Sequence, residues 1–212
     1  MKFITVLVGI LLTAHLVSGQ VTLSIDTGHK SDNHKIFTTV EQVPEFPGGY
    51  QAFYKYLSKN IRYPDVARLI GINGKLVLSF VVDENGYVTH VTPKNCIGAG
   101  CDAEAIRLLE ASPAWKPGIQ DGKLVKVSYE VPISFKIEDG KVYLKDLKKS
   151  AYGFIFNIKG VLYTLNEAEA IIGKSFMSDR VQIAEPFYNY NNIPKFEMPD
   201  KKEVYLIILK SS

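Results

Sequence analysis

Long hydrophobic runs, cysteines and an excess of one charge are all scarce in this 212-residue sequence. The 25 Lys and Arg nearly balance the 22 Asp and Glu, so the net charge of +3 gives no argument for a nucleic-acid partner. Two cysteines are too few for a disulfide-dense mini-protein, and a hydrophobic share of 46% excludes a disordered chain. What remains is a globular chain with room for one large domain or two small ones.

The N-terminal residues 1–20 have the features of an export signal. Lys2 is followed by a mostly apolar stretch from Phe3 to Val17, and small residues stand at positions 18 and 19. This pattern predicts a signal peptide that is removed on export. The alternative is an uncleaved membrane anchor, although a span requires about 20 apolar residues and this stretch falls short. After it, no segment is long and apolar enough to cross a bilayer.

The pattern of the following residues predicts a first domain over residues 41–138, after a polar leader over residues 21–40. Helical spacing, strand alternation and turn residues predict, in order, helices over 50–57 and 65–69, a hairpin over 76–92, a helix over 102–111 capped by Asp102, and a strand over 125–137. This order implies an α+β fold, a small antiparallel sheet with two to three helices on one face.

The last of these strands has the clearest pattern in the chain. From Val125 to Ile137 every second residue is apolar, and polar residues occupy the other face except at Pro132. Because proline has no N–H to donate to a ladder, we expect this strand to be an edge or to have one free side.

A second, smaller α+β module is predicted over residues 151–212, after a charged linker over residues 139–150. Thr164 and Glu167 form a capping-box pattern that predicts a helix ending at Gly173. Strands are expected over 154–158, 181–183 and 204–209. An apolar strand of this module could also pair with the free side of the strand over 125–137 and regulate access to it.

Residues that carry chemistry are few. His90 stands alone on the hairpin, the nucleophile-elbow pattern G-x-S-x-G is absent, and Gly98-Ala99-Gly100 lacks the rest of a phosphate-binding loop. No pair of titratable groups is placed as a general acid and base. We therefore expect an exported binding protein, not an enzyme, with no cofactor and no metal site.

Cys96 and Cys101 are the two cysteines, with four residues between them. Export makes a disulfide permissible, and closing so short a loop would stabilise the fold by about 2 kcal/mol. The alternative is two unpaired thiols, and the sequence leaves both open. Neither a C-x-x-C motif nor a zinc-ligand spacing is present.

The run from Val43 to Ile137 resembles the C-terminal domain of the TonB family. The resemblance is carried by these motifs in their order along the chain: Pro47-Gly48-Gly49, Tyr63-Pro64 with Ala67, Gly71-Ile72-Asn73-Gly74, the turn at 83–86, Gly98-x-Gly100-Cys101-Asp102 with Ala105, Trp115-Lys116-Pro117-Gly118, and Pro132 with Phe135.

The resemblance implies a periplasmic protein that recognises other proteins. Its expected partner is the TonB-box peptide of an outer-membrane TonB-dependent transporter, bound by β-strand addition in support of energised nutrient uptake. The edge strand expected to receive the peptide comprises Val125, Lys126, Val127, Ser128, Tyr129, Glu130 and Val131. Further candidate receptor contacts, just before the Tyr-Pro pair, are Asn60, Ile61 and Arg62.

Two departures from the family bear on the function. The family's energy transducers have an inner-membrane helix and a long proline-rich stretch, whereas residues 21–40 contain no proline and reach at most about 70 Å when fully extended. If residues 1–20 stay as an anchor, inner-membrane proton-channel proteins are further expected partners. Otherwise the alternative is a soluble periplasmic adaptor that uses the same fold with another envelope partner and transduces no energy.

Overall fold

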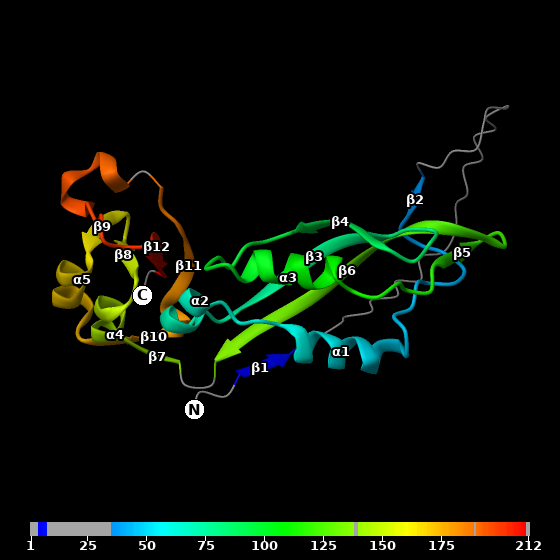
Figure 1. The fold of residues 1–212 in the computed structure, drawn as a ribbon, viewed down its shortest axis with the longest axis horizontal. Helices are drawn as coiled ribbons and strands as arrows, with labels where there is room; N and C mark the ends of the chain where they lie inside the picture. Colours follow the sequence, from blue (N-terminus) through cyan, green and yellow to red (C-terminus); the bar gives the residue numbers. More distant parts are fainter. Residues whose placement is uncertain (1–3, 8–34, 138–139, 189, 211–212) are drawn as a thin grey trace.

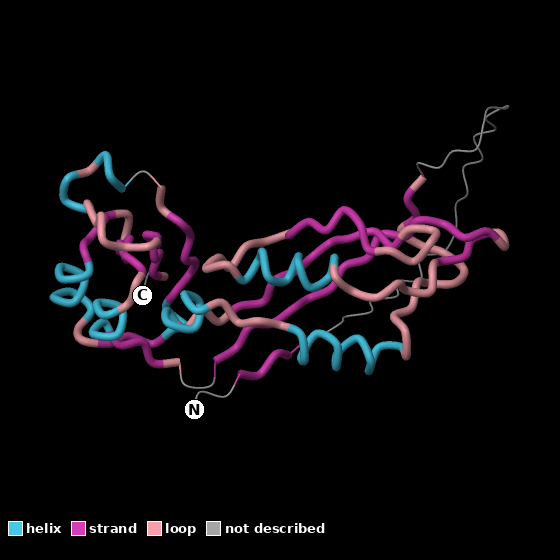
Figure 2. Tube along the Cα trace, viewed as in Figure 1, coloured by secondary structure: helices cyan, strands magenta, loops and turns pink. Residues whose placement is uncertain are grey.

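The computed structural model describes residues 4–7, 35–137, 140–188 and 190–210. Figure 1 shows an elongated molecule, with a long sheet and its helices at one end and a smaller group of strands and helices at the other. Figure 2 shows that strands and helices occur in both parts of the molecule. Except for its residues 4–7, the predicted signal segment lies outside the described residues. Among those that are described, no helix is long and apolar enough to cross a membrane.

The larger part of the molecule contains nine elements. They are β1 (Ile4–Leu7), β2 (Ile36–Phe37), α1 (Gly49–Asn60), α2 (Asp65–Ile70), β3 (Gly74–Val82), β4 (Val88–Pro93), α3 (Cys101–Glu110), β5 (Gly118–Gln120) and β6 (Lys123–Ile137). The predicted helices, hairpin and last strand are all present, which confirms the α+β class. The helix over 101–110 begins after Gly100, and the predicted cap at Asp102 is wrong. The Asp102 carboxylate instead accepts the N–H groups of Ile97 and Gly98.

The sheet is organised around β6, in the order β1-β6-β3-β4. β3 and β6 pair antiparallel from Gly74 opposite Phe135 to Val82 opposite Val127. A purely antiparallel sheet was expected, but β2 pairs with β6 in parallel. The alternation of β6 determines its two faces, because successive side chains of a strand point to opposite sides. One face buries Val131, Ile133 and Phe135.

The core of this part lies between the apolar face of the sheet and the helices. Phe53 of α1, Ile70 of α2 and Leu108 of α3 belong to the same buried cluster as the inward side chains of β3 and β6. The apolar side chains of α1 that are buried, Phe53 and Leu57, are four residues apart and so lie on one helix face.

The smaller part follows directly. Its elements are β7 (Lys141–Tyr143), α4 (Leu144–Lys149), β8 (Tyr152–Ile158), β9 (Val161–Thr164), α5 (Leu165–Ile172), β10 (Ser175–Met177), β11 (Val181–Pro186), β12 (Glu203–Leu209) and three short 3₁₀ turns, Ser178–Arg180, Tyr190–Asn192 and Pro194–Phe196. The capping box is present, with Thr164 and Glu167 bonded reciprocally at the start of α5. The stretch expected as a linker forms β7 and α4 instead, because Leu144 and Leu147 are buried among apolar neighbours.

The sheet of the smaller part has the order β11-β12-β8-β9, with β12 parallel to β8. The idea that an apolar C-terminal strand pairs with the free side of β6 is therefore wrong. β12 has β8 on one side and β11 on the other, and its alternate residues Ile207 and Leu209 enter the common core.

The two parts of the molecule are joined by side chains as well as by the chain. The Asn73 amide donates to Ser178 Oγ at 2.6 Å, and its Oδ1 accepts the N–H of Ile137 at 2.6 Å. At a second point the Ala99 N–H donates to the Ala184 carbonyl at 2.6 Å. One buried cluster contains residues of both parts, so the two parts share a hydrophobic core, and we expect them to unfold together.

Gly98 permits the close approach at that second point. Its φ is +77°, and a Cβ there would lie 1.9 Å from the Ala184 carbonyl oxygen. Gly160, in the turn between β8 and β9, has φ +85°, but no described atom lies within 4 Å of the place of its Cβ. The two glycines thus share the left-handed backbone conformation, but only Gly98 lies close to another segment of the chain.

We expect Gly98→Ala to destabilise the chain more than Gly160→Ala does. Both substitutions carry the cost of about 1 to 2 kcal/mol for a left-handed L-residue. Only Gly98→Ala also breaks the Ala99–Ala184 hydrogen bond, which adds at least about 1 kcal/mol. Urea unfolding followed by circular dichroism measures both free energies. Equal losses for the two variants would show that this contact does not hold the parts together.

Candidate functional site

The outer side of β6 is covered at both ends and open in the middle. On this side, away from β3, β2 pairs with residues 126–127 and β1 with residues 134–137. Separately, β5 forms a hairpin with residues 123–125. Between Ser128 and Ile133 no strand among the described residues pairs on this side. β6 is thus not an edge strand over its whole length, because it lies between β1 and β3 in the sheet. A free side at Pro132 stays a prediction, with which the lack of a described partner between Ser128 and Ile133 agrees. Of the predicted edge, Ser128 to Val131 are open, whereas Val125 to Val127 have partners.

Alternate backbone groups of this open stretch point away from β3. The Val77 N–H donates to Asn95 Oδ1, and the Val77 carbonyl accepts the N–H of Lys94, both at 2.8 Å. The N–H and C=O of Val77 therefore point toward β4 and away from β6. In an antiparallel pair, opposite residues either bond to each other or both point away, so the backbone of its partner Pro132 points away from β3. By the same alternation Ser128 and Glu130 present both N–H and C=O to the open side, whereas Pro132 presents only C=O.

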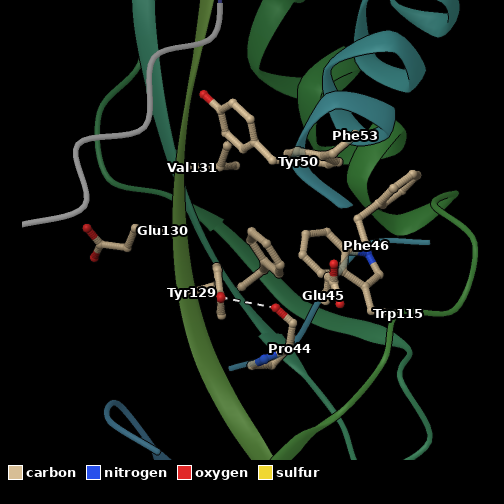
Figure 3. Close-up of a pocket in the computed structure, with 10 residues that line it drawn as sticks. Pro44, Glu45, Phe46, Tyr50, Phe53, Trp115, Tyr129, Glu130 and Val131 are labelled. Atoms are coloured by element: carbon tan, nitrogen blue, oxygen red, sulfur yellow. Dashed lines mark hydrogen bonds between the residues drawn. The ribbon is translucent and has the colours of Figure 1, made fainter. Parts of the chain in front are cut away.

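A pocket of about 450 Å³ opens beside this stretch, on the apolar face of β6. Figure 3 shows β6 on one side of it and aromatic side chains on the other, with Glu130 pointing away. The pocket is lined by Pro44, Glu45, Phe46, Tyr50, Phe53, Phe80, Trp115, Tyr129, Glu130 and Val131. We call it the aromatic pocket. These residues come from α1, β3, β6 and the segments before α1 and after α3, so the tertiary fold alone brings them together.

Ring contacts fix the walls of the aromatic pocket. Trp115 lies with its ring centroid 5.5 Å from Phe46 and 5.1 Å from Phe53, both edge-on. The backbone N–H of Trp115 donates to the Gly86 carbonyl at 2.8 Å, and its indole N–H donates to Ser112 Oγ at 3.2 Å, so backbone and ring are both held in place. Edge-on aromatic pairs each contribute about 0.5 to 1.5 kcal/mol beyond area burial, which keeps the walls rigid.

Two tyrosines line the aromatic pocket in different ways. Tyr129 donates its hydroxyl to the Pro44 carbonyl at 3.1 Å, and burial raises its pKa, so it stays neutral. Tyr50 is 45% exposed at the mouth, and its hydroxyl lies 2.7 Å from that of Tyr54. Tyr50 is therefore the aromatic lining residue whose replacement disturbs the core least.

The opposite face of β6 is polar and carries more positive than negative charge. Glu130 pairs with Lys94 at 3.4 Å, and Lys126 lies 3.9 Å from Glu84. Lys75 and Lys136 add two exposed ammonium groups. Exposed ion pairs of this kind contribute only about 0 to 1 kcal/mol each, so these lysines can exchange their partners for the charges of a ligand.

Asn60, Ile61 and Arg62, the predicted receptor contacts, lie at the C-terminal end of α1. The aromatic pocket uses Tyr50 near the start of that helix, about 15 Å away along its axis. The structure thus does not bring the two predicted groups into one site.

A pair of charged side chains on α3 holds these contact residues. The Glu104 carboxylate accepts the N–H of Arg62 at 2.7 Å and pairs with Arg107, also at 2.7 Å. Arg107 in turn donates to the Asn60 carbonyl at 3.3 Å. Burial raises the pKa of Glu104, but the hydrogen bonds from Arg107 and Arg62 outweigh it, so the pKa lies below its ordinary value.

Both cysteines are free in the structure, Cys96 exposed and Cys101 buried at the start of α3. Burial raises the pKa of the Cys101 thiol, which makes it an inert core residue. Within the described part of the chain, no three His, Cys, Asp or Glu side chains cluster as a metal site would require.

The aromatic pocket is the feature that the sequence interpretation missed. In the sequence, Trp115 stood only in a motif of the family resemblance and Tyr50 only at the start of a predicted helix. The signal present in the sequence is the chain's one tryptophan, since tryptophan is enriched at protein interfaces.

We expect Glu104→Gln to destabilise the chain by about 1 to 2 kcal/mol at neutral pH, because it weakens charge-assisted hydrogen bonds. A carboxylate whose pKa is lowered by folding stabilises fully above its unfolded pKa of about 4.3. That contribution is lost as the pH falls through the lower folded pKa. The difference between native chain and variant should therefore shrink in acid, as urea unfolding at several pH values would measure.

Glu110→Gln is the matched control, because Glu110 is exposed on the same helix. Its substitution should change stability little at any pH. A Glu104→Gln difference that does not vary with pH would contradict the role of the ionised carboxylate.

Comparison with known proteins agrees with this geometry. Residues 59–137 match the family model described as the Gram-negative bacterial TonB protein C-terminal. The match covers α2 to β6, and thus contains the open stretch of β6 and the positions 60–62. A search of curated proteins found no match. The family match supports a TonB-like protein of the bacterial envelope, and TonB family domains in general interact with outer-membrane receptors. The match over residues 59–137 thus supports a TonB family C-terminal domain in this part of the chain.

Proposed function

We propose that this chain acts in the periplasm and binds outer-membrane TonB-dependent transporters by β-strand addition, in support of energised nutrient uptake. The observation that carries the proposal is the open side of β6 between Ser128 and Ile133. The family match supports it, because the matched region ends with this strand.

The open stretch has the properties that strand addition requires. Ser128 and Glu130 offer a donor and an acceptor each, and Pro132 offers an acceptor. A peptide laid beside them gains main-chain hydrogen bonds that are independent of its sequence, while pockets for its alternate side chains provide selectivity. β3 on the other side fixes β6 in position, so the protein loses little entropy on binding.

A second candidate function is an envelope adaptor that uses the same edge for a different partner. The packed C-terminal part favours it, because β11 and the 3₁₀ turn at 178–180 rest on the domain through Ala184 and Ser178. Such a part offers additional surface for a partner other than a transporter.

Site-specific crosslinking in envelope preparations separates the two functions. A photo-crosslinking amino acid at Ser128, on the open side of β6, is expected to capture transporters through their N-terminal segments, identified by mass spectrometry of the crosslinked peptides. The matched control is the same amino acid at Lys149, an exposed position on α4, which should capture none.

Capture at Ser128 of periplasmic or cell-wall proteins alone would favour the adaptor and contradict the transporter proposal. Crosslinks to transporters from Ser128 and Lys149 alike would show contact without strand addition.

A further inference from the structure

We infer that the aromatic pocket is a specificity pocket for one bulky apolar side chain of an extended peptide on the open stretch of β6, with acidic side chains alternating on the peptide's other face. This inference rests on the proposed function and adds to it the side-chain pattern that the partner must have.

The pleat of β6 aligns the pocket with the open stretch. Tyr129 and Val131 face the pocket, and Glu130 between them points away, as Figure 3 shows. A strand paired with β6 shares its pleat, so side chains opposite Tyr129 or Val131 face the pocket and the residues between them do not. The main-chain pairing itself therefore carries every second side chain of the peptide to the aromatic pocket.

The chemistry of the pocket selects an apolar occupant. Phe46, Phe53 and Trp115 form the wall that faces β6, and the Tyr129 hydroxyl is already bonded to Pro44. The volume of about 450 Å³ is ample for one large apolar side chain, and the place of the pocket beside the open stretch of β6 favours a side chain of a bound peptide. A leucine or phenylalanine side chain of such a peptide fits within it.

Charge on the other face of β6 selects the intervening residues of the peptide. That face carries Lys75, Lys94, Lys126 and Lys136 against Glu84 and Glu130. Opposite charges across neighbouring strands are favourable and like charges are not. An extended segment in which acidic residues alternate with apolar ones thus complements both faces at once.

The test uses a fluorescein-labelled synthetic peptide of about eight residues, in which glutamates alternate with valines around a central leucine. Fluorescence anisotropy measures its dissociation constant with the full chain. Replacing the leucine by serine is expected to weaken binding about tenfold to a hundredfold, because the burial of one large apolar side chain is lost. Replacing the glutamates by lysines should also weaken binding, and this effect should diminish at high salt.

Two chain variants locate the effect. Tyr50→Ala opens the wall of the pocket and should weaken binding of the leucine peptide about fivefold. It should also reduce the penalty of the leucine-to-serine change, because the two side chains interact in one place. Tyr188→Ala is the matched control: Tyr188 is 77% exposed in the smaller part of the molecule, and its loss should change neither value.

N-methylation of alternate peptide amides distinguishes failure of this inference from failure of the proposed function. If N-methylation abolishes binding but serine binds as well as leucine, strand addition stands and the specificity pocket is overturned. If N-methylation leaves the affinity unchanged, or no peptide binds, strand addition by such peptides is overturned and the inference with it.

A second copy of the chain is the other occupant that the experiment must detect. Sedimentation of the full chain and of Tyr50→Ala reports it. If the chain forms a dimer that is lost in the Tyr50→Ala variant but is not dissociated by the leucine peptide, the pocket serves self-association. That outcome would overturn the inference.

Discussion

The antiparallel ladder between β3 and β6 is the constraint on which the rest of the molecule depends. It orients β6 so that Tyr129, Val131 and Ile133 face the core and the residues between them face solvent. A slip of one residue would exchange these faces, placing Glu130 against Trp115 and removing the aromatic pocket. The apolar alternation resists that slip, since each inward side chain stabilises the fold by about 1.5 to 3 kcal/mol when buried.

Much of this architecture follows from local sequence. The period-two pattern of β6, the Asp83-to-Gly86 turn and the reciprocal Thr164–Glu167 cap each act over a few residues, and each forms as expected. The expectation of a free side at Pro132 agrees with the absence of a described strand beside it. A residue without an N–H weakens strand pairing on that side, whichever segment of the chain would supply the partner.

Features that depend on long-range contacts could not be predicted in this way. The aromatic pocket joins Phe46, Tyr50, Trp115 and Tyr129, and no local period links these positions. Residues 139–150 were expected as a linker because they are charged, yet Leu144 and Leu147, three residues apart on one helix face, are buried in the smaller part. Asp102 satisfies a capping pattern, but its carboxylate accepts the N–H groups of Ile97 and Gly98 in the preceding turn.

The limited length of the open stretch on β6 has a consequence for the solubility of the chain. A long, flat, unpaired strand edge is a template for aggregation, on which further chains add without end. Here β2 covers residues 126 and 127 of a 15-residue strand, and Pro132 has no N–H to donate farther along it. Another copy of β6 finds no continuous ladder to extend, whereas a short guest segment does. The open stretch is thus long enough for a short segment and too short for the continuous pairing that fibril growth requires.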